Sequence, residues 1–428
     1  MTPPAERRAG AAFPAALFLA AFALRAGYSL FHPVGTPAAD AMGYDRIGWN
    51  IAQGLGFCLE PGVPTSIRGP GYPAFLALLY RLFGHSTAVV QWFQALTGAA
   101  TSLLAYGIAR RAFSETTARA AAWAVCVYPV LVAYDSMLLS ESLFTMLLAL
   151  CLWLLLRSGD AEGPLGYLPA GAVLGAATLT RPTTIMFPGV VLLVMLLRRE
   201  RALAPKVLLL AAGFAAVVAP WTARNYRRFG VFLPVSTRGV VALYATSVMA
   251  SEPGASFDDG MKRIGTGWEA FRLSPEGAGP DAAVLYDRKL GDEARRRIRS
   301  HPGGYARMVL KNFGDFWLTS HSALFGVDKP VQEYREAGSL GPIALRAGLM
   351  ALQAALLTAA GLGFWRSRAD WRRWVLLGVT LLYFNMHVLF DRIGRYHVPV
   401  LPYLLMAAAA CLTSLCAEAS AARERHRT

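Results

Sequence analysis

A chain of 428 residues could hold two or three soluble domains, but its composition excludes that organisation. Hydrophobic residues make up 55% of the chain and charged residues only 16%, and the apolar residues fall in blocks of membrane-spanning length. A net charge of +15 would suggest nucleic acid as the partner of a soluble protein. Here arginines flank the apolar blocks, so we expect membrane lipids and no nucleic acid as partners. The five cysteines show neither a disulfide framework nor metal-ligand spacing.

The apolar blocks predict an all-α polytopic membrane protein with about ten transmembrane helices. The predicted spans are Ala12–Phe31, Ala88–Ala109, Ala118–Val132, Leu143–Leu156, Leu168–Thr180, Ile185–Leu197, Val207–Trp221, Ile343–Phe364, Trp374–Phe390 and Val398–Cys416. Every short loop on the same side of the membrane as the N-terminus is basic, so the positive-inside rule places both termini in the cytoplasm. The two shortest blocks meet at Arg181 and fit either a re-entrant hairpin or two tilted half-length helices.

This alternation divides the chain into three parts. Residues 1–221 would form a transmembrane catalytic core that includes an outer loop at 32–87, residues 222–342 an extracytoplasmic cap, and residues 343–428 the last helices and a cytoplasmic tail. Within the cap, the composition of Ser251–Pro280 is typical of a mobile loop. Asp281–Ser300 predicts an exposed helix, and Tyr305–Leu318 an amphipathic helix at the membrane interface.

The segment that follows the first span begins a second amphipathic helix at Asp40. Apolar residues recur at helical spacing from Tyr44 to Leu55, as in a helix that lies on a bilayer surface. Asp40 would suit the N-terminus of this helix as a cap, because a carboxylate there accepts a hydrogen bond from an unpaired amide. On this segment alone the cap is the favoured interpretation.

Further polar motifs stand at the outer ends of later spans. They are Arg68-Gly69-Pro70-Gly71-Tyr72-Pro73, Tyr134-Asp135, Ser140-Glu141-Ser142-Leu143-Phe144, Leu179-Thr180-Arg181-Pro182, Pro220-Trp221-Thr222-Ala223-Arg224-Asn225 and Arg395-Tyr396-His397. Each has a structural explanation when taken singly: a turn, a helix cap or an interfacial anchor. Their order along the chain is more specific than any one member.

Taken in order, these motifs resemble the family 39 glycosyltransferases, a polytopic group that includes protein O-mannosyltransferases and lipid A aminoarabinose transferases. The resemblance also uses Asp40, Tyr44 and Gly56-Phe57, and covers most of residues 12–245 and the final span. It implies a GT-C-type bundle with outer-face amphipathic helices and a small extracytoplasmic insert. In two respects the chain departs from the family: Ala41 stands where many relatives have Glu, and the large outer domain of some members is missing.

The resemblance implies an integral-membrane enzyme that moves a sugar from a polyprenyl-phosphate donor to an extracytoplasmic protein, lipid-glycan or cell-wall acceptor, with inversion. Asp40 would be the general base. The donor phosphate would bind forked guanidinium groups, which are Arg68, Arg181, Arg224 and Arg395. The supporting residues would be Tyr44, Tyr72, Asp135, Glu141 and His397. No tightly bound cofactor is expected, and a divalent metal, if one takes part, would bind Asp40, Asp135 and Glu141.

A polyprenyl-linked sugar flippase is the main alternative from another functional class. Transporters show internal repeats and charges near the membrane midplane, whereas here the polar motifs gather at the outer ends and no repeat is evident. We therefore expect a glycosyltransferase of the bacterial inner membrane, with its active site on the extracytoplasmic side.

Overall fold

The computed structural model describes residues 4–32, 39–160, 163–252, 254–272, 274, 282–389 and 394–425. The predicted end of one span at Phe390 and the stretch 275–281 of the predicted loop and insert helix lie outside these residues. Among the described residues nearly all regular structure is helical, and the two short strands pair with each other as a hairpin in the first outer loop.

The N-terminal half builds most of the bundle. Its elements are α1 (Pro4–Phe31), α2 (Ala39–Ala52), β1 (Cys58–Glu60), β2 (Val63–Pro64), α3 (Gly71–Phe83), α4 (Thr87–Ala112), α5 (Glu115–Val127), α6 (Pro129–Asp135), α7 (Glu141–Gly159), α8 (Tyr167–Thr180), η1 (Pro182–Thr184), α9 (Phe187–Arg198) and α10 (Leu203–Phe229). The elements that follow are α11 (Arg238–Ser251), α12 (Phe257–Arg272), α13 (Ala282–Ser300), α14 (Pro302–Trp317), η3 (Ser322–Phe325) and α15 (Val331–Glu336). The chain then returns through α16 (Leu340–Arg366), η4 (Arg368–Asp370), α17 (Trp371–Phe384), η5 (Asn385–Leu389), η6 (Gly394–Val400) and α18 (Leu401–Arg425).

A helix forms at each of the ten predicted places, but the predicted number of spans is not confirmed. In the described part of the chain, five helical segments are long and apolar enough to cross a bilayer: Ala12–Phe31, α7, α10, α16 and Gly394–Arg425. The pair α5 and α6, bent by 51°, would make a sixth. Helices α8 and α9 are apolar but short.

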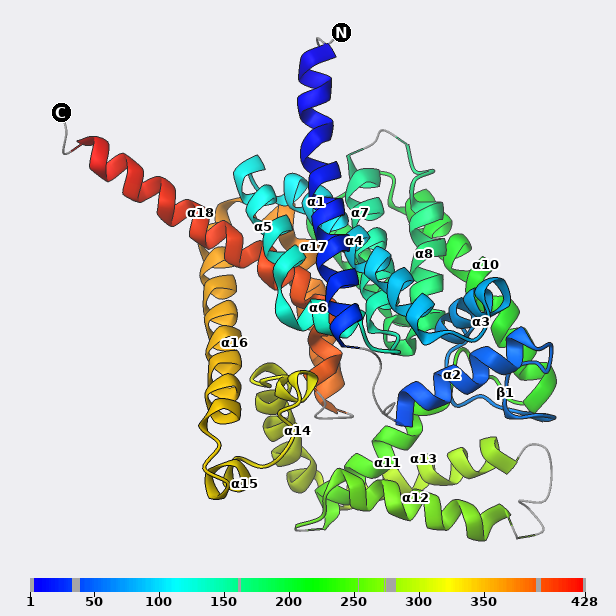
Figure 1. The fold of residues 1–428 in the computed structure, drawn as a ribbon. Helices are drawn as coiled ribbons and strands as arrows, with labels where there is room; N and C mark the ends of the chain where they lie inside the picture. Colours follow the sequence, from blue (N-terminus) through cyan, green and yellow to red (C-terminus); the bar gives the residue numbers. More distant parts are fainter. Residues whose placement is uncertain are drawn as a thin grey trace.

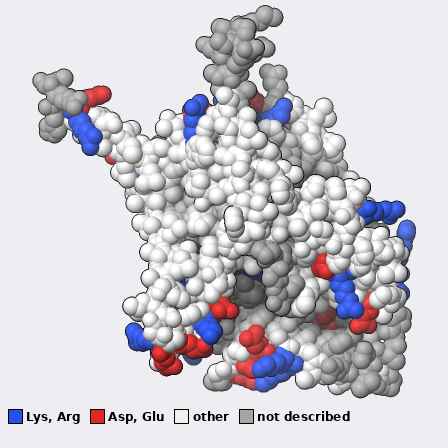
Figure 2. All heavy atoms as spheres, in the orientation of Figure 1, with Lys and Arg blue, Asp and Glu red and all other residues white. Residues whose placement is uncertain are grey.

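The arrangement in space agrees with a membrane protein. Both termini lie at one end of the bundle, whereas α2, α3 and the helices α11 to α13 lie at the other (Figure 1). Charged side chains gather towards these two ends and leave a largely uncharged band between them on the face drawn in Figure 2. Helix α7 and the segment Gly394–Arg425 are mostly buried, whereas only a minority of the residues of α1, α10 and α16 are buried, as expected of helices that face lipid.

Small residues allow the helices of the bundle to cross closely, as is common in membranes. On α8, a Cβ atom at Gly171 would clash with the carbonyl oxygen of Leu210 on α10. On α10, a Cβ atom at Gly213 would clash in the same way with Leu168. The two helices therefore pack backbone to backbone, and α8 ends at a fixed position beside the first outer loop.

The bend between α5 and α6 has a local cause. Pro129 has no N–H to offer the carbonyl of Val125, and the break also frees the carbonyl of Cys126. Arg25 of α1 donates to both carbonyls, at 3.2 Å and 2.9 Å, and its Nε lies 2.6 Å from the Asp135 carboxylate. This buried arginine, which we did not expect from the sequence, fixes the bend that precedes Glu141.

The cap differs from its prediction in one place. The expected mobile loop Ser251–Pro280 contains helix α12. Its start is a reciprocal cap, in which Ser256 Oγ accepts from the Asp259 N–H at 3.2 Å and the Asp259 carboxylate accepts from the Ser256 N–H at 2.8 Å. The predicted helix at Asp281–Ser300 is confirmed as α13, and α14 forms at the predicted Tyr305–Leu318 with Leu310 and Phe313 exposed.

Candidate functional site

Helix α2 brings Asp40 to the end of the bundle opposite both termini (Figure 1). The helix lies on α3, where Ile47 is fully buried and a Cβ atom at Gly48 would lie 2.7 Å from that of Leu76. Asp40 stands in the first turn of α2, and 12% of its side chain is exposed. The close packing of α2 therefore fixes the direction in which this carboxylate points.

Three guanidinium groups surround the Asp40 carboxylate. Arg68 Nη2 donates to Oδ1 at 2.8 Å, and Arg395 Nη2 donates to Oδ2. Arg238 Nη2 lies 3.5 Å from Oδ1. These arginines come from the first outer loop, the start of α11 and the segment before α18, so the site joins all three parts of the chain.

The turn Arg68-Gly69-Pro70-Gly71 is fixed against the end of α8. A Cβ atom at Gly69 would clash with the carbonyl oxygen of Leu179, and one at Gly71 would lie 2.5 Å from Thr180 Oγ1. Only glycine allows this approach, which holds the Arg68 guanidinium 4.4 Å from the ring centroid of Tyr44.

A second ion pair lies directly behind the first cluster. Arg181 Nη1 lies 2.6 Å from Glu141 Oε1 and donates to Ser140 Oγ at 3.3 Å. Arg395 Nε lies 3.5 Å from the same Glu141 oxygen, so Arg395 connects Asp40 to Glu141. The Arg181 guanidinium also lies 5.0 Å from the ring centroid of Tyr396.

Several of these residues line a cavity of about 330 Å³. Four arginines line it, namely Arg68, Arg181, Arg238 and Arg395, together with Asp40 and Tyr44. The remaining wall is largely apolar and includes Ile67, Ile185, Ala242 and Met386. Even when Glu141 is counted with Asp40, the four guanidiniums leave two positive charges in excess. The cavity therefore suits a ligand with an anionic group and an apolar chain.

The arginines control the protonation of Asp40. Burial by itself would raise the pKa of this carboxyl, but the charges of Arg395, Arg68 and Arg238 and the hydrogen bond from Arg395 hold the pKa well below its ordinary value. Asp40 is therefore an anion, paired with these three arginines.

Other expected site residues are placed differently. Tyr72 is fully buried and donates to Gln94 Oε1 at 2.6 Å, so it supports the packing of α3 against α4. Asp135 binds Arg25. Arg224 does not line the cavity; it donates to the Thr65 carbonyl at 3.2 Å and stacks 4.7 Å from the ring centroid of Trp221. It anchors the first outer loop to the end of α10.

His397 also points away from the cavity. Its Nδ1 donates to the Phe316 carbonyl at 2.6 Å, so its Nε2 is free to accept from His321 Nε2 at 3.1 Å. Burial, together with the neighbouring His397, lowers the pKa of His321 to about 3 and keeps it neutral. These two histidines connect α14 and η3 to η6 and thereby hold the segment that carries Arg395.

The structure does not assemble the expected metal ligands Asp40, Asp135 and Glu141 into a metal site. Within the described ranges, no three side chains of His, Cys, Asp or Glu are placed to hold an ion. Each of the three carboxylates already has an arginine as its cation. The donor set does not fit a divalent metal as arranged, and we assign no step to one.

Two residues of the site were missed in the sequence. Arg238 follows a part of the chain with no recognisable motif, and only long-range packing brings it to Asp40. His387 lines the cavity beside Tyr396, with its Nδ1 2.9 Å from the Phe384 carbonyl. The ring pair His387 and Tyr396 is stacked, which a pattern of apolar residues alone does not reveal.

Comparison with known proteins gives a family match over part of the chain. Residues 67–223 match the family described as dolichyl-phosphate-mannose-protein mannosyltransferase. The matched stretch contains Arg68, Glu141 and Arg181, and leaves out Asp40, Arg238 and Arg395. No curated protein sequence matches the chain.

Solved structures identify the fold. The archaeal oligosaccharyltransferase AglB from Archaeoglobus fulgidus, in complex with an inhibitory peptide and a dolichol-phosphate, superposes with a TM-score of 0.59 at 15% identity, over 99% of this chain and 52% of its own. An Archaeoglobus fulgidus oligosaccharyltransferase tethered to an acceptor peptide gives 0.52 at 16% identity, over 92% and 49%. ArnT from Cupriavidus metallidurans, bound to undecaprenyl phosphate, gives 0.42 at 16% identity, over 93% and 77%.

The chain therefore has the fold of the GT-C glycosyltransferase superfamily. It spans about half the length of the archaeal chains that it matches.

Proposed function

We propose that this protein is an integral-membrane glycosyltransferase that moves a sugar from a polyprenyl-phosphate donor to an acceptor outside the cytoplasm, with Asp40 as the general base. One observation carries the proposal: four arginines and a carboxylate line a cavity whose remaining wall is largely apolar. A phosphate on an isoprenoid chain has the same division into an anionic head and an apolar tail. The AglB structure with dolichol-phosphate supports this class of donor.

The arrangement suits an inverting transfer. An acceptor hydroxyl would attack the anomeric carbon of the sugar while the bond from that carbon to the phosphate oxygen breaks, and its electron pair leaves with the lipid phosphate. The guanidiniums would stabilise the charge that grows on the phosphate, and little acid assistance is needed. The acceptor proton would pass to Asp40.

Donor binding would also prepare the base. The phosphate competes with Asp40 for Arg68, Arg238 and Arg395, because all three already bind an anion. As these arginines turn to the phosphate, Asp40 loses the positive charge that depresses its pKa. Glu141 keeps Arg181 in place from behind.

The proposal also states on which side of the membrane the site lies. The cavity is built by α2, the start of α11 and the segment before α18, at the end of the bundle opposite both termini (Figure 1). Arginines flank the apolar helices at the terminal end, which supports a cytoplasmic terminal end and an extracytoplasmic site in the inner membrane of a bacterium. The acceptor is a protein, a lipid glycan or a cell-wall polymer.

The test uses purified protein in proteoliposomes with polyprenyl-phosphate-linked radiolabelled sugars and an envelope extract as the acceptor source. Transfer of label with release of free polyprenyl phosphate is the expected result. Movement of intact donor across the bilayer without cleavage would contradict the proposal and establish the flippase instead.

A further inference from the structure

Arg238 reaches the site from a different structural unit than the other arginines. It is the first residue of α11, which packs on α12 and α13. From here on, the word cap refers to these three helices alone and no longer to all of residues 222–342. Gly260 of α12 lies so close to α11 that a Cβ atom would be 2.6 Å from Ala245 Cα, and Tyr286 of α13 donates to the Ile264 carbonyl of α12 at 2.9 Å. The N-terminus of α11 is where the cap meets the core, since the Thr237 N–H donates to the Ser66 carbonyl at 3.1 Å.

Among the three guanidiniums at Asp40, Arg238 is held least firmly. Its side chain is 34% exposed, against 11% for Arg68 and 18% for Arg395. Its 3.5 Å separation from Asp40 is longer than the 2.8 Å of Arg68. Gly239 and Ala242 of the same helix line the cavity, so the start of α11 forms part of its wall. An anion that enters the cavity therefore meets a guanidinium that can turn to it at little cost.

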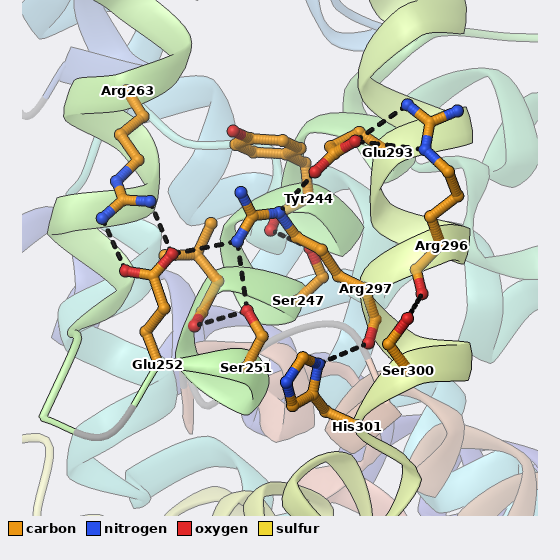
Figure 3. Close-up of polar contacts among 11 residues, drawn as sticks. Tyr244, Ser247, Ser251, Glu252, Arg263, Glu293, Arg296, Arg297, Ser300 and His301 are labelled. Carbon is orange, nitrogen blue, oxygen red and sulfur yellow. Dashed lines mark hydrogen bonds and ion pairs between the residues drawn. The ribbon is translucent and has the colours of Figure 1, made fainter.

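The other end of α11 is tied to both remaining cap helices by one carboxylate (Figure 3). Arg263 of α12 forks onto Glu252, with its two terminal nitrogens 2.7 Å and 2.6 Å from the two oxygens. Arg297 of α13 donates to the same carboxylate at 2.9 Å and to Ser251 Oγ at 3.1 Å. Single exposed ion pairs contribute little, but here a forked pair and a second arginine share one carboxylate, and together they fix the relative positions of three helices.

We propose that Arg238 is a donor-phosphate ligand supplied by the cap, and that the Glu252 cluster is a positioning element that holds α11 so that Arg238 reaches the cavity. This inference rests on the proposed function, because it takes the lipid phosphate as the anion. It makes the site incomplete without the cap, although Glu252 does not itself line the cavity.

The test measures binding of undecaprenyl phosphate, and separately of uncharged undecaprenol, to the full-length protein in nanodiscs. Arg238→Gln should weaken binding of the phosphate about tenfold or more and leave binding of the alcohol unchanged. Arg238→Lys keeps the charge but loses the forked geometry, so its affinity for the phosphate should lie between those of the wild type and Arg238→Gln. Glu252→Gln should weaken phosphate binding by about threefold, again without an effect on the alcohol. Arg295→Gln, which removes an exposed cap arginine paired with Asp292 in its own helix, is the matched control and should bind as the wild type does.

The outcomes separate this inference from the function on which it rests. If the wild type binds the phosphate no better than the alcohol, the proposed function fails. If the wild type prefers the phosphate and Arg238→Gln binds it equally well, only the assignment of Arg238 is overturned. Unchanged phosphate binding in Glu252→Gln overturns the positioning role of the cluster.

Discussion

Two arginine–carboxylate clusters lie in the same bundle and differ in what surrounds them. Arg25 is 1% exposed, and its nitrogens bind Asp135 and the carbonyls of Ala21, Val125 and Cys126. At Asp40, by contrast, the guanidiniums of Arg68, Arg238 and Arg395 face a cavity and share one carboxylate.

Under the proposed function, the same chemistry serves structure in one place and ligand binding in the other. At Arg25 the protein supplies a partner for every nitrogen, so the arginine is part of the fold. At Asp40 the charges are unequal and the surplus faces open space, so an anion from outside can complete the cluster. Burial alone does not separate the two kinds of site, because Arg181 and Glu141 at the cavity are also buried.

From this comparison we predict that substitution of Arg25 has the largest effect on stability. Arg25→Met would leave Asp135 buried without its cation and free the two carbonyls at the bend, which should cost about 3–5 kcal/mol of unfolding free energy. Thermal unfolding of the purified protein in detergent, followed by tryptophan fluorescence, measures this. A double variant with Asp135→Leu should recover part of the loss. If Arg25→Met unfolds at the same temperature as the wild type, Arg25 is not a structural residue.

A second prediction concerns ligand binding. Arg395→Lys keeps the charge at the cavity but loses the fork, so affinity for undecaprenyl phosphate should fall about tenfold, or about 1.4 kcal/mol. Arg224→Lys is the matched control from another outer motif, and should leave that affinity unchanged because Arg224 does not line the cavity. The affinities are measured by titration in nanodiscs. If Arg224→Lys loses as much affinity as Arg395→Lys, Arg224 takes part in binding the phosphate.

The smallest effect is expected at Asp287 on α13, where burial rather than arginine sets the charge. Burial raises the pKa of Asp287 to about 6, against the opposing effect of a hydrogen bond from Thr237. Its stabilising contribution is therefore complete below about pH 4 and is lost as the pH rises through about 6. Asp287→Asn should raise the unfolding free energy by about 1 kcal/mol at pH 7.5 and change little at pH 4. If Asp287→Asn changes the unfolding free energy equally at pH 4 and pH 7.5, the prediction that Asp287 titrates between these pH values is wrong.

The sequence contains enough information for the class of fold and for part of the site. Apolar length located a helix at every predicted place, and the ordered motifs pointed to Asp40, Arg68, Arg181 and Arg395, which the structure brings to one cavity. A motif does not state which way its side chain points. This is why Arg224 was expected to bind the donor phosphate and His397 to support the site, although both bind other elements. Arg238 depends on packing between the cap and the core, which local pattern does not encode. Arg25 did leave a signal, because an arginine within an apolar span requires a partner.

The central claim is that Asp40 holds the place of the donor phosphate until the donor arrives and then acts as the base. Its most direct test compares Asp40→Asn with Asp45→Asn, a neighbour on α2 whose carboxylate binds Tyr80 and His85 outside the cavity. Asparagine is close in size to aspartate but accepts no proton at neutral pH. We predict that Asp40→Asn binds undecaprenyl phosphate more tightly than the wild type, because the competing carboxylate is gone, while sugar transfer falls by about 10²-fold or more. Asp45→Asn should change neither phosphate binding nor sugar transfer. Normal transfer by Asp40→Asn, or a loss of phosphate binding in that variant, would contradict the account.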